Sequence, residues 1–134
     1  MTAFFTRHAG IRVSLFIEPD AKAIDAAARL GAPVVELHTG RYCHAVADGN
    51  VDAAARELAR IAMATRHSAS VGIEVHAGHG LTFDSVKPVA ALPEIVELNI
   101  GHFLVGEAIF VGFETAVRQM RTLMNEARRA GAAA

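Results

Sequence analysis

The sequence has very little cysteine, no cluster of basic residues and no long apolar run. Its single cysteine, Cys43, cannot form a disulfide within the chain, and no second thiol stands at the spacing of a metal site. The formal net charge is −1 and the basic residues are dispersed, so the chain has no electrostatic footprint for nucleic acid or an anionic membrane. No run approaches the ~20 apolar residues of a membrane span, and the opening MTAFFTRH lacks the apolar core of a signal peptide. These absences predict a cytoplasmic protein that acts on small molecules.

Apolar residues, in contrast, are plentiful enough for a sizeable core. They make up 52% of the 134 residues, which suits one domain. Short apolar runs bounded by Gly, Pro and Asp predict strands, and apolar residues at helical spacing predict helices between them. The expected strands are residues 11–17, 34–38, 73–77 and 96–100, and the expected helices are 21–30, 52–70, 86–92 and a last one from about residue 112. Residues 39–50 are expected to form a polar loop.

This alternation of strands and helices predicts an α/β fold built from four βα units. Strands joined by crossover helices are parallel, and parallel sheets are buried on both faces, which explains the nearly continuous apolar strands. Two architectures fit the pattern. One is an open doubly wound sheet, and the other is part of a (β/α)8 barrel, which needs about twice this length.

Two of the expected strands end in Gly and His, in EVHAGHGL at 74–81 and ELNIGH at 97–102. Glycine lets backbone N–H groups approach an anion, and histidine adds a proton-transfer group that titrates near neutrality. Both architectures bind ligands at the carboxyl ends of the strands. The polar residues expected there are Glu36, His38, His79, Asn99 and His102. The sequence therefore predicts one shared site that binds phosphate and performs acid–base chemistry.

The individual residues also allow other interpretations. Glu36 lies two residues before His38, on the same strand face, and is either a buried structural carboxylate paired with Lys, Arg or a backbone N–H, or an electrostatic or acid–base group. His79, flanked by glycines just past a strand, favours a functional role. Gly101 and His102 form either a phosphate-binding turn or an ordinary turn at the end of a strand.

Two further sequence patterns, at His76 and His79 and at residues 41–44, each have a functional and a structural interpretation. His76 and His79 have the spacing of an HxxH metal pair, with His38 or His102 as a third ligand. No metal is expected, because the third ligand would come from another strand and because glycines suit a phosphate rather than a metal. Residues 41–44 form either a lid over the site or a solvated surface loop.

Several collinear motifs resemble the second half of the pyridoxine 5'-phosphate synthase family. They are VSLFIEPD, APVVELHTGRY, ELARIA, AGHGL and ELNIGHFLVGEAIFVG, and the likeness runs over residues 10–129. The resemblance implies that residues 11–134 form half of a TIM (β/α)8 barrel, with strands five to eight of the family fold. Residues 1–10 are expected to be a poorly matching N-terminal segment.

The resemblance also implies a reaction and roles for particular residues. The family condenses 1-deoxy-D-xylulose 5-phosphate with 3-amino-2-oxopropyl phosphate, closes the pyridine ring and releases phosphate and water, with no metal or organic cofactor implied. Glu36 matches the family's glutamate that stabilises the transition state, and His79 matches its proton donor. Gly80, Gly101 and His102 match positions that hold the phosphate of the aminoketone.

The first four βα units of the family are absent, and with them a catalytic His, a catalytic Glu and most contacts to deoxyxylulose phosphate. We therefore expect the chain to be incomplete as an enzyme on its own, and we expect its first and last strands to expose unpaired edges. It is a fragment of a longer chain, pairs with a separate N-terminal half, or pairs with a second copy. A non-catalytic phosphate-metabolite binding or assembly module is the alternative function, and an unrelated phosphate-handling barrel enzyme is a third.

Overall fold

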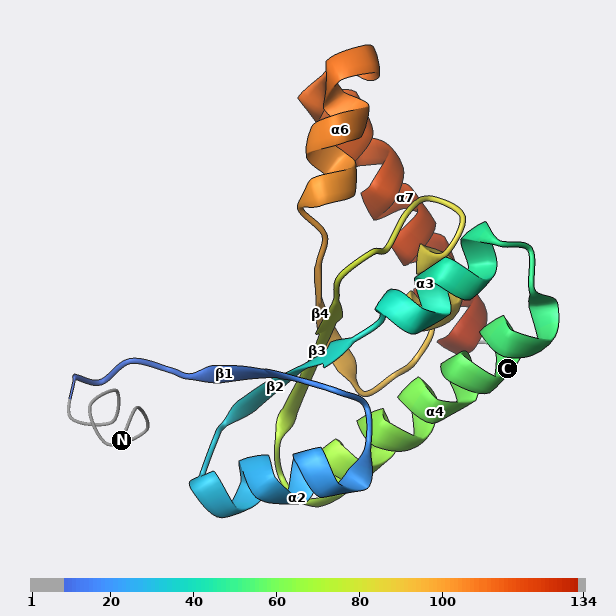
Figure 1. Cartoon of the computed structure of the whole chain (residues 1–134). Coiled ribbons are helices and arrows are strands. Elements are labelled where there is room, and N and C mark those ends of the chain that lie inside the picture. Colours follow the sequence, from blue (N-terminus) through green and yellow to red (C-terminus); the bar gives the residue numbers. More distant parts are fainter. Residues whose placement is uncertain (1–8, 133–134) are drawn as a thin grey trace.

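The structure, a computed structural model, describes residues 9–132 and contains four parallel strands that alternate with helices (Figure 1). The elements in chain order are β1 (Ser14–Ile17), α2 (Ala21–Leu30), β2 (Val34–His38), α3 (Gly40–Ala47), α4 (Val51–Ser70), β3 (Glu74–Gly78), α5 (Val86–Ala90), β4 (Ile95–Asn99), α6 (His102–Val111) and α7 (Phe113–Ala132). The predicted α/β class with four βα units is confirmed.

The strand order in the sheet decides between the two candidate architectures. The order is β1-β2-β3-β4, which is the order along the chain, and every neighbouring pair is parallel. A doubly wound sheet reverses its strand order at a switch point, whereas a barrel adds each strand beside the previous one. The four units therefore form half of a (β/α)8 barrel.

The core lies between the sheet and its helices. Val35, Leu37 and Val75 project from the strands into a buried cluster that includes Ile24 of α2 and Ile61 of α4. On a strand, the intervening residues point to the opposite face, which in a barrel is the interior. One row across this inner face consists of Phe16, Glu36, His76 and Glu97, which are paired in register.

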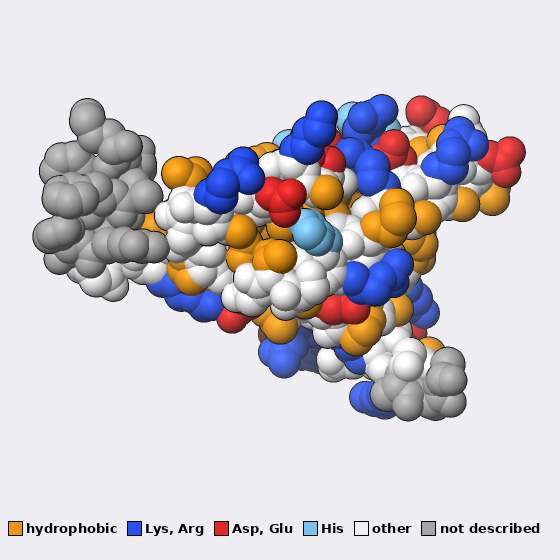
Figure 2. All heavy atoms as spheres, turned by 90° about the horizontal axis from the view of Figure 1, so that it is seen from below, with side chains coloured by type: hydrophobic (Ala, Val, Ile, Leu, Met, Phe, Trp, Pro, Cys, Tyr) orange, Lys and Arg blue, Asp and Glu red, His pale blue; other side chains and the backbone are white. Residues whose placement is uncertain are grey.

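The inner face is partly open to solvent. The Phe16 side chain, which lies at the edge strand β1, is 53% exposed, and Val96 of the other edge strand is 64% exposed. The view from below in Figure 2 shows Lys and Arg side chains dispersed among acidic and apolar ones, without a single basic patch on that face. The molecule therefore has exposed apolar edges that a full barrel would cover.

The start and stop of α2 follow from local chemistry. The side chain of Asp20 accepts a hydrogen bond from the Ala23 N–H at 3.0 Å, which caps the first turn. Gly31 ends the helix in the left-handed conformation, with φ of 69°. Both residues were the predicted boundary signals.

The predicted loop at residues 39–50 is wrong over most of its length, because residues 40–47 form helix α3. Tyr42 and Cys43 are buried in this helix, and the Tyr42 hydroxyl donates a hydrogen bond to the Ser85 carbonyl oxygen at 3.1 Å. A leading glycine and interspersed polar residues concealed the helical pattern.

Two other boundaries also differ from the prediction. Helix α6 precedes the predicted last helix and projects away from the sheet beside α7 (Figure 1). Apolar residues lie on all its sides, with Glu107 as its one acidic residue, so it shows no amphipathic periodicity. Strand β1 begins at Ser14 rather than at residue 11, because Ser14 pairs with Val34, where β2 itself begins.

Within residues 9–132, no helix combines the length and the apolarity needed to cross a bilayer. Most of the predicted N-terminal segment, residues 1–10, lies outside the described residues, which begin at residue 9. The predicted division between residues 1–10 and 11–134 therefore stays a prediction.

Candidate active site

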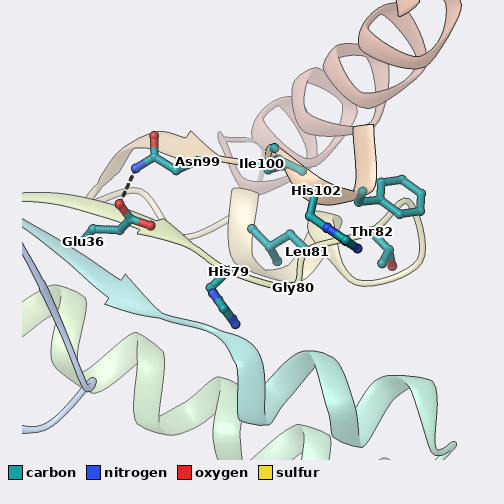
Figure 3. Close-up of a pocket in the computed structure, with 10 residues that line it drawn as sticks. Glu36, His79, Gly80, Leu81, Thr82, Asn99, Ile100 and His102 are labelled. Atoms are coloured by element: carbon teal, nitrogen blue, oxygen red, sulfur yellow. Dashed lines mark hydrogen bonds between the residues drawn. The ribbon is translucent and has the colours of Figure 1, made fainter. Parts of the chain in front are cut away.

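A pocket of about 420 Å³ lies at the carboxyl ends of the strands, where the segments after β3 and β4 converge (Figure 3). It brings together four of the five polar residues expected at the strand ends, whereas His38 does not line it. Its lining consists of Glu36, His79, Gly80, Leu81, Thr82, Asn99, Ile100, Gly101, His102 and Phe103. Residues of β2 and β4 and of the segments that follow β3 and β4 thus form one site, as the shared position of the strand ends predicted.

Glu36 is held by an amide rather than by a cation. It is half-buried in β2, and its Oε2 accepts a hydrogen bond from Asn99 Nδ2 of β4 at 2.8 Å (Figure 3). Gly78 of the intervening strand leaves space for the carboxylate, because a Cβ at that position would collide with Glu36 Oε1. An amide from β4 and a glycine in β3 therefore position the carboxylate together.

His79 lies directly after β3 and has an unusual backbone conformation. Its φ is 76°, and it is the one non-glycine residue with positive φ in residues 9–132. The imidazole is exposed and lies beside the ring of His38, with ring centroids 4.5 Å apart. His38 in turn places Nδ1 3.5 Å from Glu18 Oε1. The pocket thus has a proton-transfer group at its mouth.

The opposite wall of the pocket is the beginning of α6. Gly101 occupies the N-cap position and His102 is the first helical residue, while no described side chain caps this helix. The unpaired N–H groups and the dipole of a helix N-terminus favour an anion. A Cβ on Gly101 would meet nothing within 4 Å, so packing does not explain why this position is glycine.

The sequence profile of the family described as "Pyridoxal phosphate biosynthesis protein PdxJ" matches residues 3–126. The chain belongs to the PdxJ family. It is 61% identical over 126 residues to the pyridoxine 5'-phosphate synthase of Rhodospirillum rubrum, covering 94% of this chain and 49% of that protein. It is 57% identical over 122 residues to the synthase of Jannaschia sp., covering 91% and 49%. With that of Zymomonas mobilis it shares 61% identity over 120 residues, covering 90% and 45%.

This PdxJ chain therefore spans about half the length of the relatives it matches. The predicted resemblance is confirmed. Membership of the PdxJ family also agrees with the half barrel in the structure, since four strands are half of the eight that a closed (β/α)8 barrel contains.

Residues 41–44 of this PdxJ chain were predicted to form either a lid or a solvated surface loop, and both alternatives are wrong because the segment belongs to helix α3. Tyr42 and Cys43 belong to the core, and Cys43 Sγ lies 3.7 Å from Thr39 Oγ1. Burial raises the pKa of the Cys43 thiol more than its hydrogen bonds lower it. The segment is therefore part of the packed core, and burial keeps its thiol a poor nucleophile.

His76 and His79 do not combine into a metal site. Nε2 of His76 lies 2.8 Å from Glu74 Oε1, and Nδ1 lies 3.5 Å from Glu97 Oε1, so carboxylates flank both nitrogens. Arg12 donates a hydrogen bond to Glu74, and this bond, with that of His76, lowers the pKa of the Glu74 carboxyl. Across residues 9–132, no three His, Cys, Asp or Glu residues form a group able to hold a metal ion.

Sequence reasoning located Asn99 at the strand ends and gave it no role, and it missed Thr39 altogether. The Thr39 hydroxyl lies 2.8 Å from both the Gly78 and the His79 carbonyl oxygens. Both residues stand inside motifs that carry the PdxJ resemblance, in VELHTG and ELNIGH. Their contacts join residues 39 or more positions apart, or 63 in the case of Asn99 and Glu36, which no local pattern reveals.

Proposed function

We propose that this chain supplies the aminoketone-phosphate half of a pyridoxine 5'-phosphate synthase site, and so acts in vitamin B6 biosynthesis. The completed site would condense 1-deoxy-D-xylulose 5-phosphate with 3-amino-2-oxopropyl phosphate. The observation that carries the proposal is the meeting of Glu36, His79, Gly80, Gly101 and His102 in one pocket. The family and the names of its relatives support pyridoxine 5'-phosphate as the product, and the two substrates are those that the resemblance implies.

The phosphate of the aminoketone would bind where α6 begins. The backbone N–H groups that follow Gly101 would donate to the phosphate oxygens, and His102 would add a further donor. Glycine at 101 lets the ligand approach the backbone closely, which explains a position that packing leaves free. All the residues named for this end of the site belong to this chain.

The chemical end of the pocket lies between Glu36 and His79. An imidazole that donates a proton to a departing oxygen would assist each loss of water or phosphate in a condensation. The Glu36 carboxylate, fixed by Asn99, would stabilise the positive charge that develops when an amine attacks a carbonyl group. Neither role needs a metal or an organic cofactor.

The general bases of the reaction would come from a second half barrel. The chain spans about half of its relatives, and its edge strands expose Phe16 and Val96. We propose that a complementing N-terminal half, covalently attached or separate, pairs with β1 and β4 and buries these side chains. Because both substrates are charged phosphate esters that do not cross membranes freely, we propose the cytoplasm as the compartment.

Self-association is a second proposal, and it rests on α6. This helix is rich in apolar residues, none of its residues is buried, and Ile109 and Phe110 are 79% and 84% exposed. We propose that α6 packs against another copy of the chain in a homo-oligomer. Sedimentation should show that Phe110→Glu lowers the molar mass of the assembly; the same mass for the variant would contradict the role of α6.

The decisive experiment is formation of pyridoxine 5'-phosphate from both substrates. The chain is assayed alone and after mixing with an N-terminal half expressed from the Rhodospirillum rubrum relative. Turnover in the mixture but not by either half supports the proposal. Turnover by the chain alone would show that the bases lie within these 134 residues.

A non-catalytic phosphate-binding module is the alternative, since the whole phosphate end of the pocket belongs to this chain. It predicts that inorganic phosphate or the aminoketone phosphate binds, by calorimetry, while the mixed halves associate without turnover. Gly101→Val, which would block the approach to the α6 N-terminus, should abolish that binding under either proposal.

A further inference from the structure

The backbone conformation of His79 is unfavourable for an L-amino acid. With φ at 76°, its Cβ approaches a neighbouring carbonyl oxygen, and such a conformation persists only where the surroundings hold it. Gly80 follows with φ of 92°, which glycine adopts readily, so the strain of this turn lies at His79. Some group outside the turn must therefore hold it.

Thr39 is the group in contact with this turn. Its side chain is fully buried, and its hydroxyl oxygen lies 2.8 Å from the Gly78 carbonyl oxygen and 2.8 Å from that of His79. The Thr39 N–H also donates to the Gly78 oxygen at 2.8 Å. One residue at the end of β2 thus fixes the carbonyl groups on both sides of the His79 Cα.

The ring of His79 is restrained from the same segment. The His38 ring lies beside it with an angle of 32° between the planes. A Cβ on Gly40 would lie 2.6 Å from His38 Cε1 and 3.3 Å from His79 Cδ2, so the residue after Thr39 must be small for the two rings to sit where they do. Residues 38–40 together fit the His79 backbone and its imidazole.

We propose that Thr39 is a positioning residue for His79. Its hydroxyl holds the strained turn so that the imidazole faces the pocket, and it acts through His79 because it does not itself line that pocket. The proposal rests on the proposed function, in which His79 is the proton donor. A hydroxyl is required at this position, whereas a methyl group is not.

The kinetic test compares Thr39→Val with Thr39→Ser in the chain completed by an N-terminal half. Valine keeps the shape and removes the hydroxyl, and serine keeps the hydroxyl. A proton donor displaced by about 1 Å costs up to about 100-fold in rate, so Thr39→Val should lower kcat by about 10- to 100-fold with little change in KM for the aminoketone phosphate. Thr39→Ser should stay within about threefold of the unchanged chain.

A second readout is independent of turnover. In the 134-residue chain labelled with [13Cε1]histidine, Thr39→Val should move or broaden the His79 resonance, and Thr39→Ser should leave it in place. The resonance of His67, which pairs with Asp25 away from the site, is the internal control. This measurement tests the positioning role even if the mixed halves show no turnover, which separates it from failure of the proposed function.

Three results would overturn the proposal. They are an unmoved His79 resonance in Thr39→Val, equal damage from serine and valine, or a change in KM without a change in kcat. Should Thr39→Val fail to fold, Thr39→Ala replaces it, because alanine removes the hydroxyl without placing a methyl group against two carbonyl oxygens. The same readouts then apply.

Discussion

Gly78 is the position in the sheet where a single methyl group should do most harm. A Cβ there would lie 2.7 Å from the backbone oxygen of Asn99 and 3.0 Å from the Asn99 Cβ, and it would collide with Glu36 Oε1. A side chain can rotate away, but a backbone oxygen in the neighbouring strand moves only with that strand. Gly78→Ala should therefore loosen β4 and displace the Glu36 carboxylate at the same time.

The cost follows from the overlap. Ordinary contact begins at 3.4 Å, so β3 and β4 must separate by about 0.7 Å where they are paired. Overpacking of this kind costs about 1–3 kcal/mol, and the lower conformational entropy of alanine in the unfolded chain returns about 0.4–1 kcal/mol. A net loss of about 1–2 kcal/mol in the free energy of unfolding is expected.

Urea unfolding followed by circular dichroism measures this loss. With a slope of about 2 kcal/mol per molar urea, the midpoint should fall by about 0.5–1 M. Gly106→Ala is the matched control, because a Cβ there meets nothing within 4 Å and alanine favours the helical state by about 0.5–1 kcal/mol. A midpoint for Gly78→Ala at or above that of the unchanged chain would refute the steric argument.

Three further predictions concern single side chains. Burial, followed by the charge of the neighbouring thiolate, raises the pKa of Tyr42 from 10.0 to about 12, so its contribution to stability is complete below pH 10 and is lost as the pH rises through about 12. Tyr42→Phe should lower the free energy of unfolding by about 1 kcal/mol at pH 7, because the hydrogen bond to Ser85 is lost. It should also flatten the decline of the urea midpoint at alkaline pH. An equal decline in both proteins would contradict the role of the Tyr42 hydroxyl. Asn99→Leu removes the donor to Glu36 and should lower kcat of the completed enzyme by about tenfold with its fold intact, whereas an unchanged rate would make the amide dispensable. Gly101→Ala should leave the unfolding midpoint within about 0.3 M and weaken phosphate binding measured by calorimetry, and unchanged affinity would remove the α6 N-terminus from the site.

The fold was largely predictable because its strands and helices are encoded locally. Asp20 and Gly31 mark the ends of α2, and apolar runs mark the strands. The order of the strands was not encoded in this way, since periodicity is the same in a barrel and in an open sheet. Helix α3 does have an apolar face, but it is short, it begins with Gly40 and its polar residues resemble a loop. Helix α6 carries apolar residues on all its sides, so it has no amphipathic period.

The site was predictable as a place rather than as a set of contacts. Polar residues at the ends of parallel strands meet by geometry, and Glu36, His79 and His102 do lie on one pocket. The roles given to them by resemblance stay predictions. The hydrogen bonds that hold these residues could not be predicted from the sequence, because the Asn99 amide and the Thr39 hydroxyl reach across the sheet to residues far away in the chain.

The row Phe16, Glu36, His76 and Glu97 limits what can complete the barrel. Closure would take two carboxylates of this row out of bulk solvent, and removing a charge from water is costly unless a donor or a cation replaces the lost hydration. An apolar surface of the right shape would therefore be rejected, and a matching half must present donors, cations or ordered water to these positions. The chemistry of the inner face thus selects its complement by solvation as well as by shape.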